Sequence, residues 1–369
     1  MVIDRRLLLE LGVAALVSGG AGAALGSEPA RDRYVSAARR PDGRYVLVIV
    51  TGDGRIEREI AIEARGHDIA LSPDGRLAVA FARRPGTFAL ALDLLAAEPK
   101  AIFSAPHDRH FYGHGTFSPD GRLLYATEND FEAARGVLGI YDVGAGFARV
   151  GEVDTHGVGP HDVVLLGDGR TLCVANGGIE THPASGRAKL NVESMRPSLA
   201  FIDRESGDLR ARHELGRGLN QLSIRHLCAD AAGRVWLGCQ WEGETSQSPE
   251  LVGIASLDAP VRLIAPAAPL GVALKGYIGA VAASRDGRVV AASAPRAGRA
   301  IYLDAASERM IGETILPDCC GLAPADGAST IAISSGLGAI RRARPTAAGE
   351  DSALVPGLAF DNHLRRLPA

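Results

Sequence analysis

The residues best suited to carry chemistry are histidines that recur at one place in a repeated pattern. His67, His114, His161 and His226 each come six or seven residues before a tight turn, in runs such as GHDIALSPDG and GHGTFSPDG. Neutral imidazole with nearby carboxylates suits Fe, Cu, Zn or Mn better than Ca. We predict a single transition-metal site with His67, His114 and His161 among its ligands. The alternative is that each His-Asp pair forms an ordinary structural hydrogen bond.

Two adjacent cysteines, Cys319 and Cys320, come six or seven residues before the last turn, as the histidines do before theirs, and are predicted to belong to the same metal site. In an oxidising compartment such a pair either closes a strained disulfide or offers thiolates to a soft metal. The other three cysteines, Cys173, Cys228 and Cys239, lie in apolar runs and are expected to be small core residues. Five cysteines in a chain of this length do not indicate a disulfide framework.

A second set of polar residues is expected at the same mouth of the predicted channel. Most of them follow the turns by six to ten residues, and they combine carboxylates and amides with two arginines that suit an anionic ligand through bidentate hydrogen bonds. Arg83-Arg84 falls in the same region, where a solvated rim is the alternative. The residues assigned to a ligand-binding mouth are Glu128, Asn129, Asp130, Asn176, Glu180, His182, Arg225, His226, Gln240, Trp241, Tyr277 and Arg296.

Sequence motifs of common enzymes are missing from the chain. It contains no G-x-S-x-G elbow, no P-loop and no C-x-x-C-H sequence for covalent haem. No nucleophile with an adjacent base can be named, so no catalytic residue is assigned.

The elements that would position these residues are marked by a repeated turn, usually Asp-Gly, between two short apolar runs. This pattern is the strongest short-range hairpin signal. A second hairpin signal follows most copies, and two hairpins per repeat of about 40 to 50 residues indicate a β-propeller. The seven turns are centred on Asp42, Asp74, Asp120, Asp168, Ala232, Asp286 and Asp326.

We therefore predict an all-β protein with a single seven-bladed β-propeller over residues 27–369, with six or eight blades as alternatives. All seven turns are expected between the first and second strands of a blade, which leaves the opposite face for the histidines and the polar mouth. The first repeat is short, and residues 358–367 (LAFDNHLRRL) are expected to supply its missing strand and close the ring.

The first 26 residues read as a twin-arginine export signal. Arg5-Arg6 precedes a weakly apolar stretch of about 15 residues, shorter than the roughly 20 needed to cross a bilayer, and small residues follow where a peptidase could cut. A periplasmic protein with no membrane span in its mature form is expected. The formal charge of −3 and the lack of a basic cluster argue against a nucleic-acid partner.

Several longer motifs resemble the bacterial family known as domain of unknown function 1513. They include GHGTFSPDGRLLYATEND at 113–130, THGVGPHD at 155–162, ANGGIETHPASGRAKLNVESMRPSLAFID at 175–203 and the C-terminal DNHLRR. The resemblance covers nearly the whole mature chain. It implies a Tat-exported periplasmic propeller similar to the YVTN and quinoprotein amine dehydrogenase beta-chain propellers. The family's association with imelysin-type iron-regulated proteins and a di-haem oxidoreductase implies a part in iron or other metal acquisition, with such proteins as partners.

Two functions from different classes follow from these observations. The first is a non-enzymatic periplasmic propeller that binds a metal, a small ligand or a partner protein at the polar mouth. The second is an enzyme of the lactonase or quinoprotein-dehydrogenase type of propeller, in which a bound divalent metal acts as a Lewis acid on a small oxygenated substrate. The family resemblance assigns no catalytic residue and leaves both open.

Overall fold

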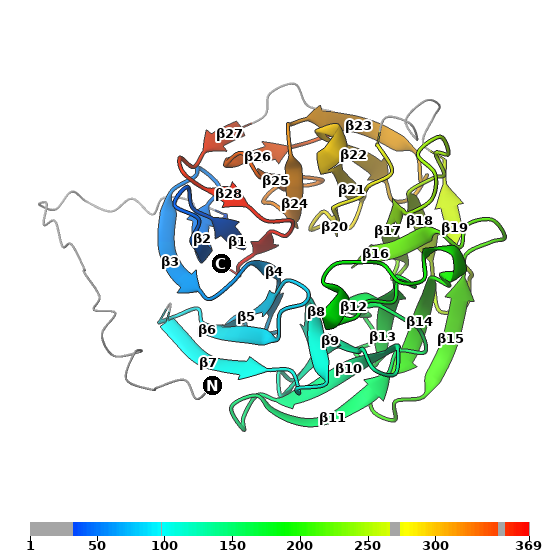
Figure 1. Cartoon of the computed structure of the whole chain (residues 1–369). Helices are drawn as coiled ribbons and strands as arrows, with labels where there is room; N and C mark the ends of the chain where they lie inside the picture. The colour runs from blue at the N-terminus through cyan, green and yellow to red at the C-terminus, as the bar shows by residue number, and fades with distance from the viewer. Residues whose placement is uncertain (1–31, 97, 266–273, 346–350, 369) are drawn as a thin grey trace, which may run out of the picture. The chain divides into compact units, whose positions relative to one another are not determined.

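The protein forms a ring of seven antiparallel sheets, as the computed structural model shows for residues 32–96, 98–265, 274–345 and 351–368. The innermost strands of successive sheets contact one another around the ring, and the sheets follow in chain order from blue to red in Figure 1. All seven belong to one unit, Asp32–Ala369. The predicted seven-bladed propeller is confirmed, whereas the predicted signal segment 1–26 lies outside the described residues.

The blades are built from short strands, most of them four to nine residues long, and the strands of each blade follow one another from the central channel outwards. Blade 1 holds β28 (Ala359–Phe360) and β29 (Arg365–Arg366), then β1 (Arg33–Arg39), β2 (Tyr45–Thr51) and β3 (Ile56–Ile62); blade 2 holds β4 (Gly66–Leu71), β5 (Leu77–Ala82), β6 (Phe88–Asp93) and β7 (Glu98–Ser104); blade 3 holds β8 (Arg109–Phe117), β9 (Leu123–Asp130), β10 (Arg135–Asp142) and β11 (Ala148–Asp154); blade 4 holds β12 (Pro160–Leu165), β13 (Thr171–Asn176), β14 (Ser198–Asp203) and β15 (Leu209–Glu214).

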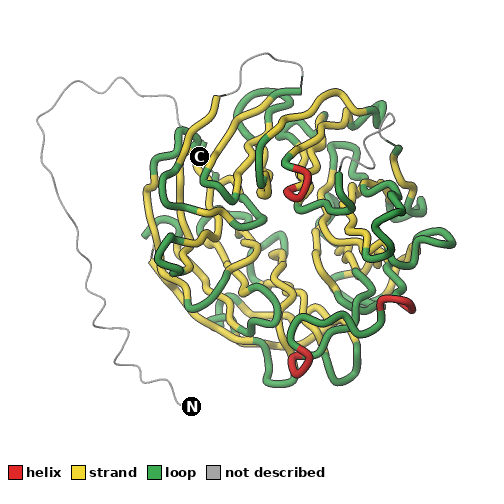
Figure 2. Tube along the Cα trace, turned by 45° about the horizontal axis from the view of Figure 1, so that its top comes forward, coloured by secondary structure: helices red, strands yellow, loops and turns green. Residues whose placement is uncertain are grey.

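The remaining blades follow the same order. Blade 5 holds β16 (Leu222–Ala229), β17 (Val235–Trp241), β18 (Val252–Ala255) and β19 (Arg262–Ile264); blade 6 holds β20 (Ala280–Ala283), β21 (Val289–Ala294), β22 (Arg299–Asp304) and β23 (Met310–Ile315); blade 7 holds β24 (Cys319–Pro324), β25 (Ile331–Ser335), β26 (Ala339–Ala343) and β27 (Asp351–Leu354). Short 3-10 turns, η1 (Pro183–Ser185), η2 (Val192–Ser194) and η3 (Pro295–Ala297), lie in the loops between strands (Figure 2). No helix among the described residues is long and apolar enough to cross a membrane.

The ring is closed by the C-terminal segment, as the sequence predicts. Phe360 pairs with Ala38, and Arg366 pairs with Tyr34, so β28 and β29 run antiparallel to β1 on its inner side. The hydroxyl of Ser36 donates to the carbonyl of His363 at 2.7 Å between these two short strands. Pairing of the last strand with the first blade covers an edge that would otherwise be left open.

This closure corrects the expected place of one turn. Because β28 and β29 form the innermost strand of blade 1, β1 and β2 become its second and third strands. The Asp42-Gly43 turn therefore joins the second strand to the third, and only the other six repeated turns join the first strand to the second. The sequence pattern identifies a hairpin but does not say which pair of strands in the blade it joins.

Three of the repeated turns are held by a serine and an aspartate two residues apart. In blade 2 the Ser72 hydroxyl donates to Asp74 and accepts from the amide of Leu77, and Gly75 takes a φ of 68°. Blades 3 and 6 repeat these contacts with Ser118 and Ser284. Gly is favoured after the aspartate because a side chain would be strained at this φ.

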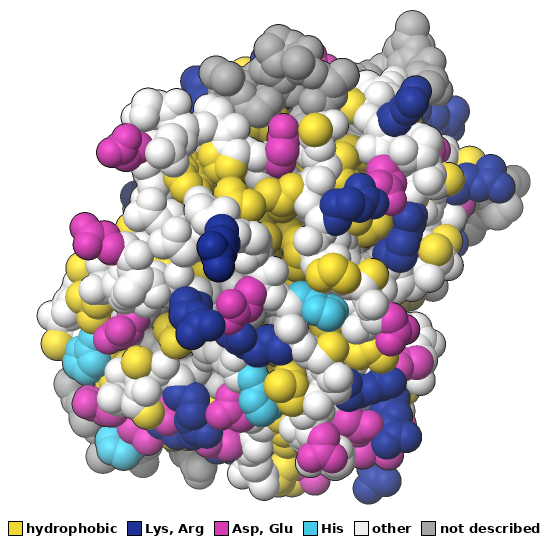
Figure 3. Space-filling model, turned by 90° about the vertical axis from the view of Figure 1, so that its right-hand side faces the viewer, with side chains coloured by type: hydrophobic (Ala, Val, Ile, Leu, Met, Phe, Trp, Pro, Cys, Tyr) yellow, Lys and Arg dark blue, Asp and Glu magenta, His cyan; other side chains and the backbone are white. Residues whose placement is uncertain are grey.

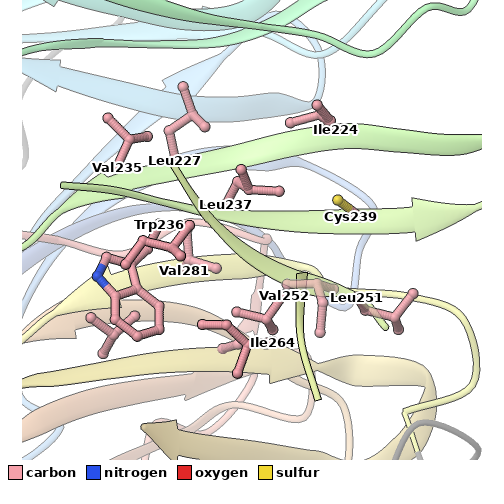
Figure 4. Packing of buried hydrophobic residues seen from close by; sticks show 14 of the residues in the cluster. Ile224, Leu227, Val235, Trp236, Leu237, Cys239, Leu251, Val252, Ile264 and Val281 are labelled. Atoms are coloured by element: carbon pink, nitrogen blue, oxygen red, sulfur yellow. The ribbon is translucent and has the colours of Figure 1, made fainter. Parts of the chain in front are cut away.

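Trp236 of β17 is the largest fully buried side chain of the core between blades 5 and 6. Its indole is 0% exposed and packs in a cluster that includes Leu237 and Val281 (Figure 4). The indole N–H donates to the Asp230 carboxylate at 2.8 Å, so its one polar atom is satisfied. Inner strands are buried on both faces, whereas outer strands such as β7 alternate exposed and half-buried residues.

Replacing Trp236 with alanine should lower the free energy of unfolding by about 3 to 5 kcal/mol, because it leaves a cavity and removes one hydrogen bond to Asp230. Urea unfolding followed by circular dichroism measures the change. Leu95→Ala is the control, since Leu95 is 82% exposed and its loss should change stability by less than about 0.5 kcal/mol. Equal losses for the two variants would contradict this view of the core.

Candidate functional site

Five buried histidines from five different blades form a closed ring in the central channel. They are His67 on β4, His114 on β8, His161 on β12, His226 on β16 and His363 between β28 and β29. Ring centroids of successive members, including His363 to His67, lie 4.8 to 5.0 Å apart. The predicted convergence of His67, His114, His161 and His226 is thus observed, and the closing strand adds a fifth imidazole.

The strands are irregular where they carry these histidines. Pairing between the first and second strands shifts register between Gly66 and Ile69 in blade 2 and between Ile224 and His226 in blade 5. Such bulges re-aim side chains. At Gly113, φ is 106° and a Cβ atom would lie 2.6 Å from the Cδ2 of His67. Glycine before His114 therefore lets two imidazoles approach from adjacent blades.

Two buried carboxylates hold one of the five rings. The Nδ1 of His114 lies 2.9 Å from Asp68 and 3.2 Å from Asp162. Burial alone would lower the pKa of His114, but Asp162 and Asp68 outweigh it and raise the pKa to about 9. Asp162 also accepts from the Leu227 amide at 2.9 Å, and Arg365 forms an ion pair with Asp68. The Nδ1 of His114 thus contacts both carboxylates, and its Nε2 is buried without a hydrogen-bond partner among the described residues.

The other four imidazoles are held in the neutral form. Burial lowers the pKa of His67 to about 4, and burial together with neighbouring imidazoles or arginines lowers those of His161, His226 and His363 well below the usual range. Within the described part of the chain, both ring nitrogens of His226 and one of His363 lack any hydrogen-bond partner. A neutral imidazole with a free nitrogen is the form in which histidine binds metals.

The ring contains two overlapping groups of three histidines with metal-ligand spacing. His67, His114 and His161 form one, and His114, His226 and His363 form the other, with their ligand atoms within 4.8 Å of one another. Ligands of a tetrahedral Zn site are roughly 3.4 Å apart, so the ligand atoms of either group would have to move closer together to hold an ion. His114 belongs to both. With a pKa of about 9 it would have to release the proton of Nε2 to bind an ion, and carboxylates on its Nδ1 are the usual outer partners of a metal-bound histidine.

A pocket of about 210 Å³ opens directly over this ring. His67, His161 and His226 form its floor, and Tyr112 and Asn362 also contribute. Its other lining residues come from strand ends, loops and a 3-10 turn on the side of the blades opposite the six first-strand turns: Arg83, Arg84, Arg187, Lys189, Arg225, Gln240, Trp241, Glu242, Tyr277 and Arg296. The structure thus places a ring of buried histidines next to a polar pocket that three of them line.

Half of the predicted ligand-binding mouth lines this pocket. Arg225, His226, Gln240, Trp241, Tyr277 and Arg296 are all present there. The guanidinium of Arg296 lies 4.3 Å from the centre of the Tyr277 ring, a cation–π distance. Arg83 and Arg84, for which a solvated rim was the alternative, are half-buried in the pocket.

The other half belongs to blade interiors or to loops beside the pocket. Glu128, 0% exposed, faces outwards in blade 3 and binds Tyr141 and Arg149. The remaining five also have protein partners outside the pocket. In blade 3, Asn129 forms a hydrogen bond with His110 and Asp130 forms an ion pair with Arg109. In blade 4, Asn176 donates to the Thr155 carbonyl, the backbone amide of Glu180 donates to Asn191, and His182 caps η1. In blade 3 the strand β9 continues through Asp130, so Glu128, Asn129 and Asp130 lie within a strand and do not line the pocket.

The cysteine pair does not join the histidines. Cys319 and Cys320 are buried free thiols whose pKa values are raised by burial, and Cys320 donates to the carbonyl of Asp361 at 3.1 Å. Neither belongs to a group of metal-ligating side chains among the residues described. Cys173 and Cys239 are buried core residues as expected, and Cys228 is half-buried.

Sequence reasoning missed His363, Tyr112, Arg187 and Lys189. A partial signal for His363 was available, because LAFDNHLRRL was expected to supply the missing strand of the first blade and contains a histidine, but that strand was not expected to be the innermost one. Arg187 and Lys189 lie in the long loop between β13 and β14, and Arg187 donates to the carbonyl of Arg84 at 3.2 Å. No sequence periodicity identifies such a contact between two loops.

The fold and the site define a seven-bladed β-propeller with a histidine-lined channel under a polar pocket. The chain belongs to the family described as Protein of unknown function (DUF1513), whose model matches residues 60–367. No curated protein matches the chain.

Solved structures share the fold at low sequence identity. The periplasmic gluconolactonase PpgL of Pseudomonas aeruginosa is 16% identical with a TM-score of 0.62, over 92% of this chain and 99% of that one. The hydrazine synthase of Kuenenia stuttgartiensis is 14% identical with a TM-score of 0.58, over 92% of this chain and 100% of that one. At these identities the similarity concerns the fold.

Proposed function

We propose that this protein is a transition-metal-binding β-propeller that holds one ion on the imidazoles of its channel. The observation that carries the proposal is the ring of five buried histidines, each of which has at least one ring nitrogen without a hydrogen-bond partner among the described residues. Burying an unpaired polar group costs roughly 1 to 3 kcal/mol, so several such atoms at one place need a compensating ligand. A metal ion satisfies three or four of them at once.

The donor set selects among metals. Imidazole suits Zn, Cu and Fe, while Mn prefers carboxylate and water ligands. The carboxylates of Asp68 and Asp162 contact the Nδ1 side of His114 and are already used by Arg365 and by backbone amides. We therefore favour Zn, Cu or Fe over Mn among the four candidate ions.

The test is metal analysis of the protein purified without chelators, together with titration of chelator-treated protein by Zn, Cu(II), Fe(II) and Mn. We expect one ion per chain in the wild type and none in the His67→Ala, His114→Ala, His161→Ala triple variant. His107→Ala is the control, because the side chain of His107 is 99% exposed. Circular dichroism shows whether the triple variant is folded. If folded wild-type protein takes up none of the four ions, the proposal is wrong.

Metal-dependent hydrolysis is a second candidate, favoured by the pocket that opens onto His67, His161 and His226. An ion on these rings would face the pocket, where it could polarise a carbonyl oxygen of a small substrate. The fold is shared with a gluconolactonase, so lactone hydrolysis by the metal-loaded protein is the assay to run. Turnover that depends on the ion and disappears in the triple variant would support an enzyme, and binding without turnover would support a carrier or docking protein.

Export to the periplasm and a role beside iron-acquisition proteins complete the proposal. Both follow from the twin-arginine sequence and from the family resemblance. Fractionation of cells that express the full chain tests the compartment. Co-purification with an imelysin-type protein or a di-haem oxidoreductase, compared between wild type and the triple variant, tests the partner.

A further inference from the structure

The pocket above the histidine ring has a marked excess of positive charge. Six of its lining side chains are cationic, namely Arg83, Arg84, Arg187, Lys189, Arg225 and Arg296, and one, Glu242, is a carboxylate. On the face of the molecule shown in Figure 3, by contrast, basic and acidic side chains are interspersed. The whole chain carries a formal charge of −3, so the excess is local to the pocket.

Half of these cations have carboxylate partners. Glu242 pairs with Lys189 and, at 3.4 Å, with Arg225, while Asp361 lies 3.4 Å from Arg83. Asp361 is further shared with Arg65. Two carboxylates thus serve four cations on two sides of the pocket.

The other half have none. No carboxylate in the described part of the chain lies within 4.0 Å of the guanidinium of Arg84, Arg187 or Arg296. Arg84 is half-buried, and burial together with Arg225 and Arg187 lowers its pKa. The Nε of Arg225, a residue that is only 9% exposed, also lacks a hydrogen-bond partner among the described residues. Guanidinium groups that repel one another in a partly dry pocket favour an anion between them.

The groups around Arg84 suit the oxygens of such an anion. The buried phenol of Tyr112 lies beside Arg84, and Arg187 reaches Arg84 from the β13–β14 loop of blade 4. Arginine pairs with carboxylate and phosphate oxygens through two parallel hydrogen bonds. At roughly 30 Å³ per water, a pocket of about 210 Å³ has the volume of about seven waters, which suits a small organic acid or a pyrophosphate.

We propose that this pocket binds a small oxyanion with at least two negative charges, held by Arg84, Arg187 and Arg225. The proposal is independent of the metal, because these arginines belong to the pocket walls and the histidines to its floor. The shared chemistry is a pair of carboxylate or phosphate groups on one small molecule.

Isothermal titration of chelator-treated protein tests the proposal with propane-1,2,3-tricarboxylate and with pyrophosphate as probes. We expect at least one probe to bind with one site per chain and to bind more weakly as sodium chloride rises from 0.05 to 0.5 M. Binding of only the first probe identifies a carboxylate ligand, and binding of only the second identifies a phosphate ligand. Glycerol, a neutral molecule of similar size, should not bind.

Arg84→Gln and Arg225→Gln should each weaken binding about 10-fold to 100-fold, because each removes charge-assisted hydrogen bonds. Arg58→Gln is the control, since Arg58 is exposed on β3, away from the pocket. Arg84 is the less buried of the two, so its variant keeps the test valid if the other does not fold. The proposal is overturned if neither probe binds at millimolar concentration or if both variants bind like the wild type. Because metal is removed beforehand, these outcomes do not depend on the proposed metal site.

Discussion

A His114→Ala variant is expected to bind the proposed transition-metal ion more than 100-fold more weakly than the wild type. His114 belongs to both groups of three histidines, so its loss leaves neither complete. Its Nδ1 already lies between Asp68 and Asp162, so Nε2 is the nitrogen that would bind the proposed ion. Competition against a chelator of known affinity, followed by metal analysis, measures the change.

An Asp162→Asn variant tests whether Asp162 orients His114, the proposed metal ligand, without binding the ion itself. It should weaken metal binding about 10-fold to 100-fold, the usual effect of changing a partner of a metal-bound histidine. For His114→Ala the matched control is His213→Ala, because His213 lies on an outer strand and faces the carbonyl of Ser256. If His114→Ala keeps wild-type affinity while the protein remains folded, His114 is not a ligand and the two groups of three do not describe the site.

An Arg365→Met variant should lower the free energy of unfolding by about 3 kcal/mol. Arg365 of β29 forms a two-contact ion pair with Asp68 of β4, with Nε 2.8 Å from Oδ1, and so links the closing segment to blade 2. Asp68 is 1% exposed, and removing the partner of a buried charge costs about 3 to 5 kcal/mol. We expect the lower end, because the Arg365 side chain is itself 37% exposed and His114 remains near the carboxylate.

Urea unfolding at neutral pH measures this change, and Arg44→Met serves as the control. Arg44 pairs with Asp42 in an exposed turn, where both side chains are more than half exposed, so its loss should cost at most about 1 kcal/mol. Deletion of residues 358–369 should destabilise the protein more than either substitution, since it removes both closing strands. If the Arg365 and Arg44 variants are equally stable, the buried pair does not contribute to closure.

The fold was predictable from the sequence because its evidence is local and repeated. A tight turn between two apolar runs specifies a hairpin wherever it occurs, and seven copies specify seven blades. Ring closure could also be predicted from the sequence, since the first repeat is short by one strand and the C-terminal segment can supply a strand. The convergence of the histidines was largely predictable for the same reason, as four of the five lie at one position of the repeat.

Tertiary structure decided the pocket and the use of individual polar residues. Whether Glu128 faces the channel or the interior of its blade depends on where β9 ends, and that is set by its pairing with β10 up to Asp130. Arg84 and Arg187 meet only because loops of two different blades lean over one channel. The sequence repeat determines which residues occupy equivalent strand positions, whereas bulges and loop contacts between blades determine which of them share a site.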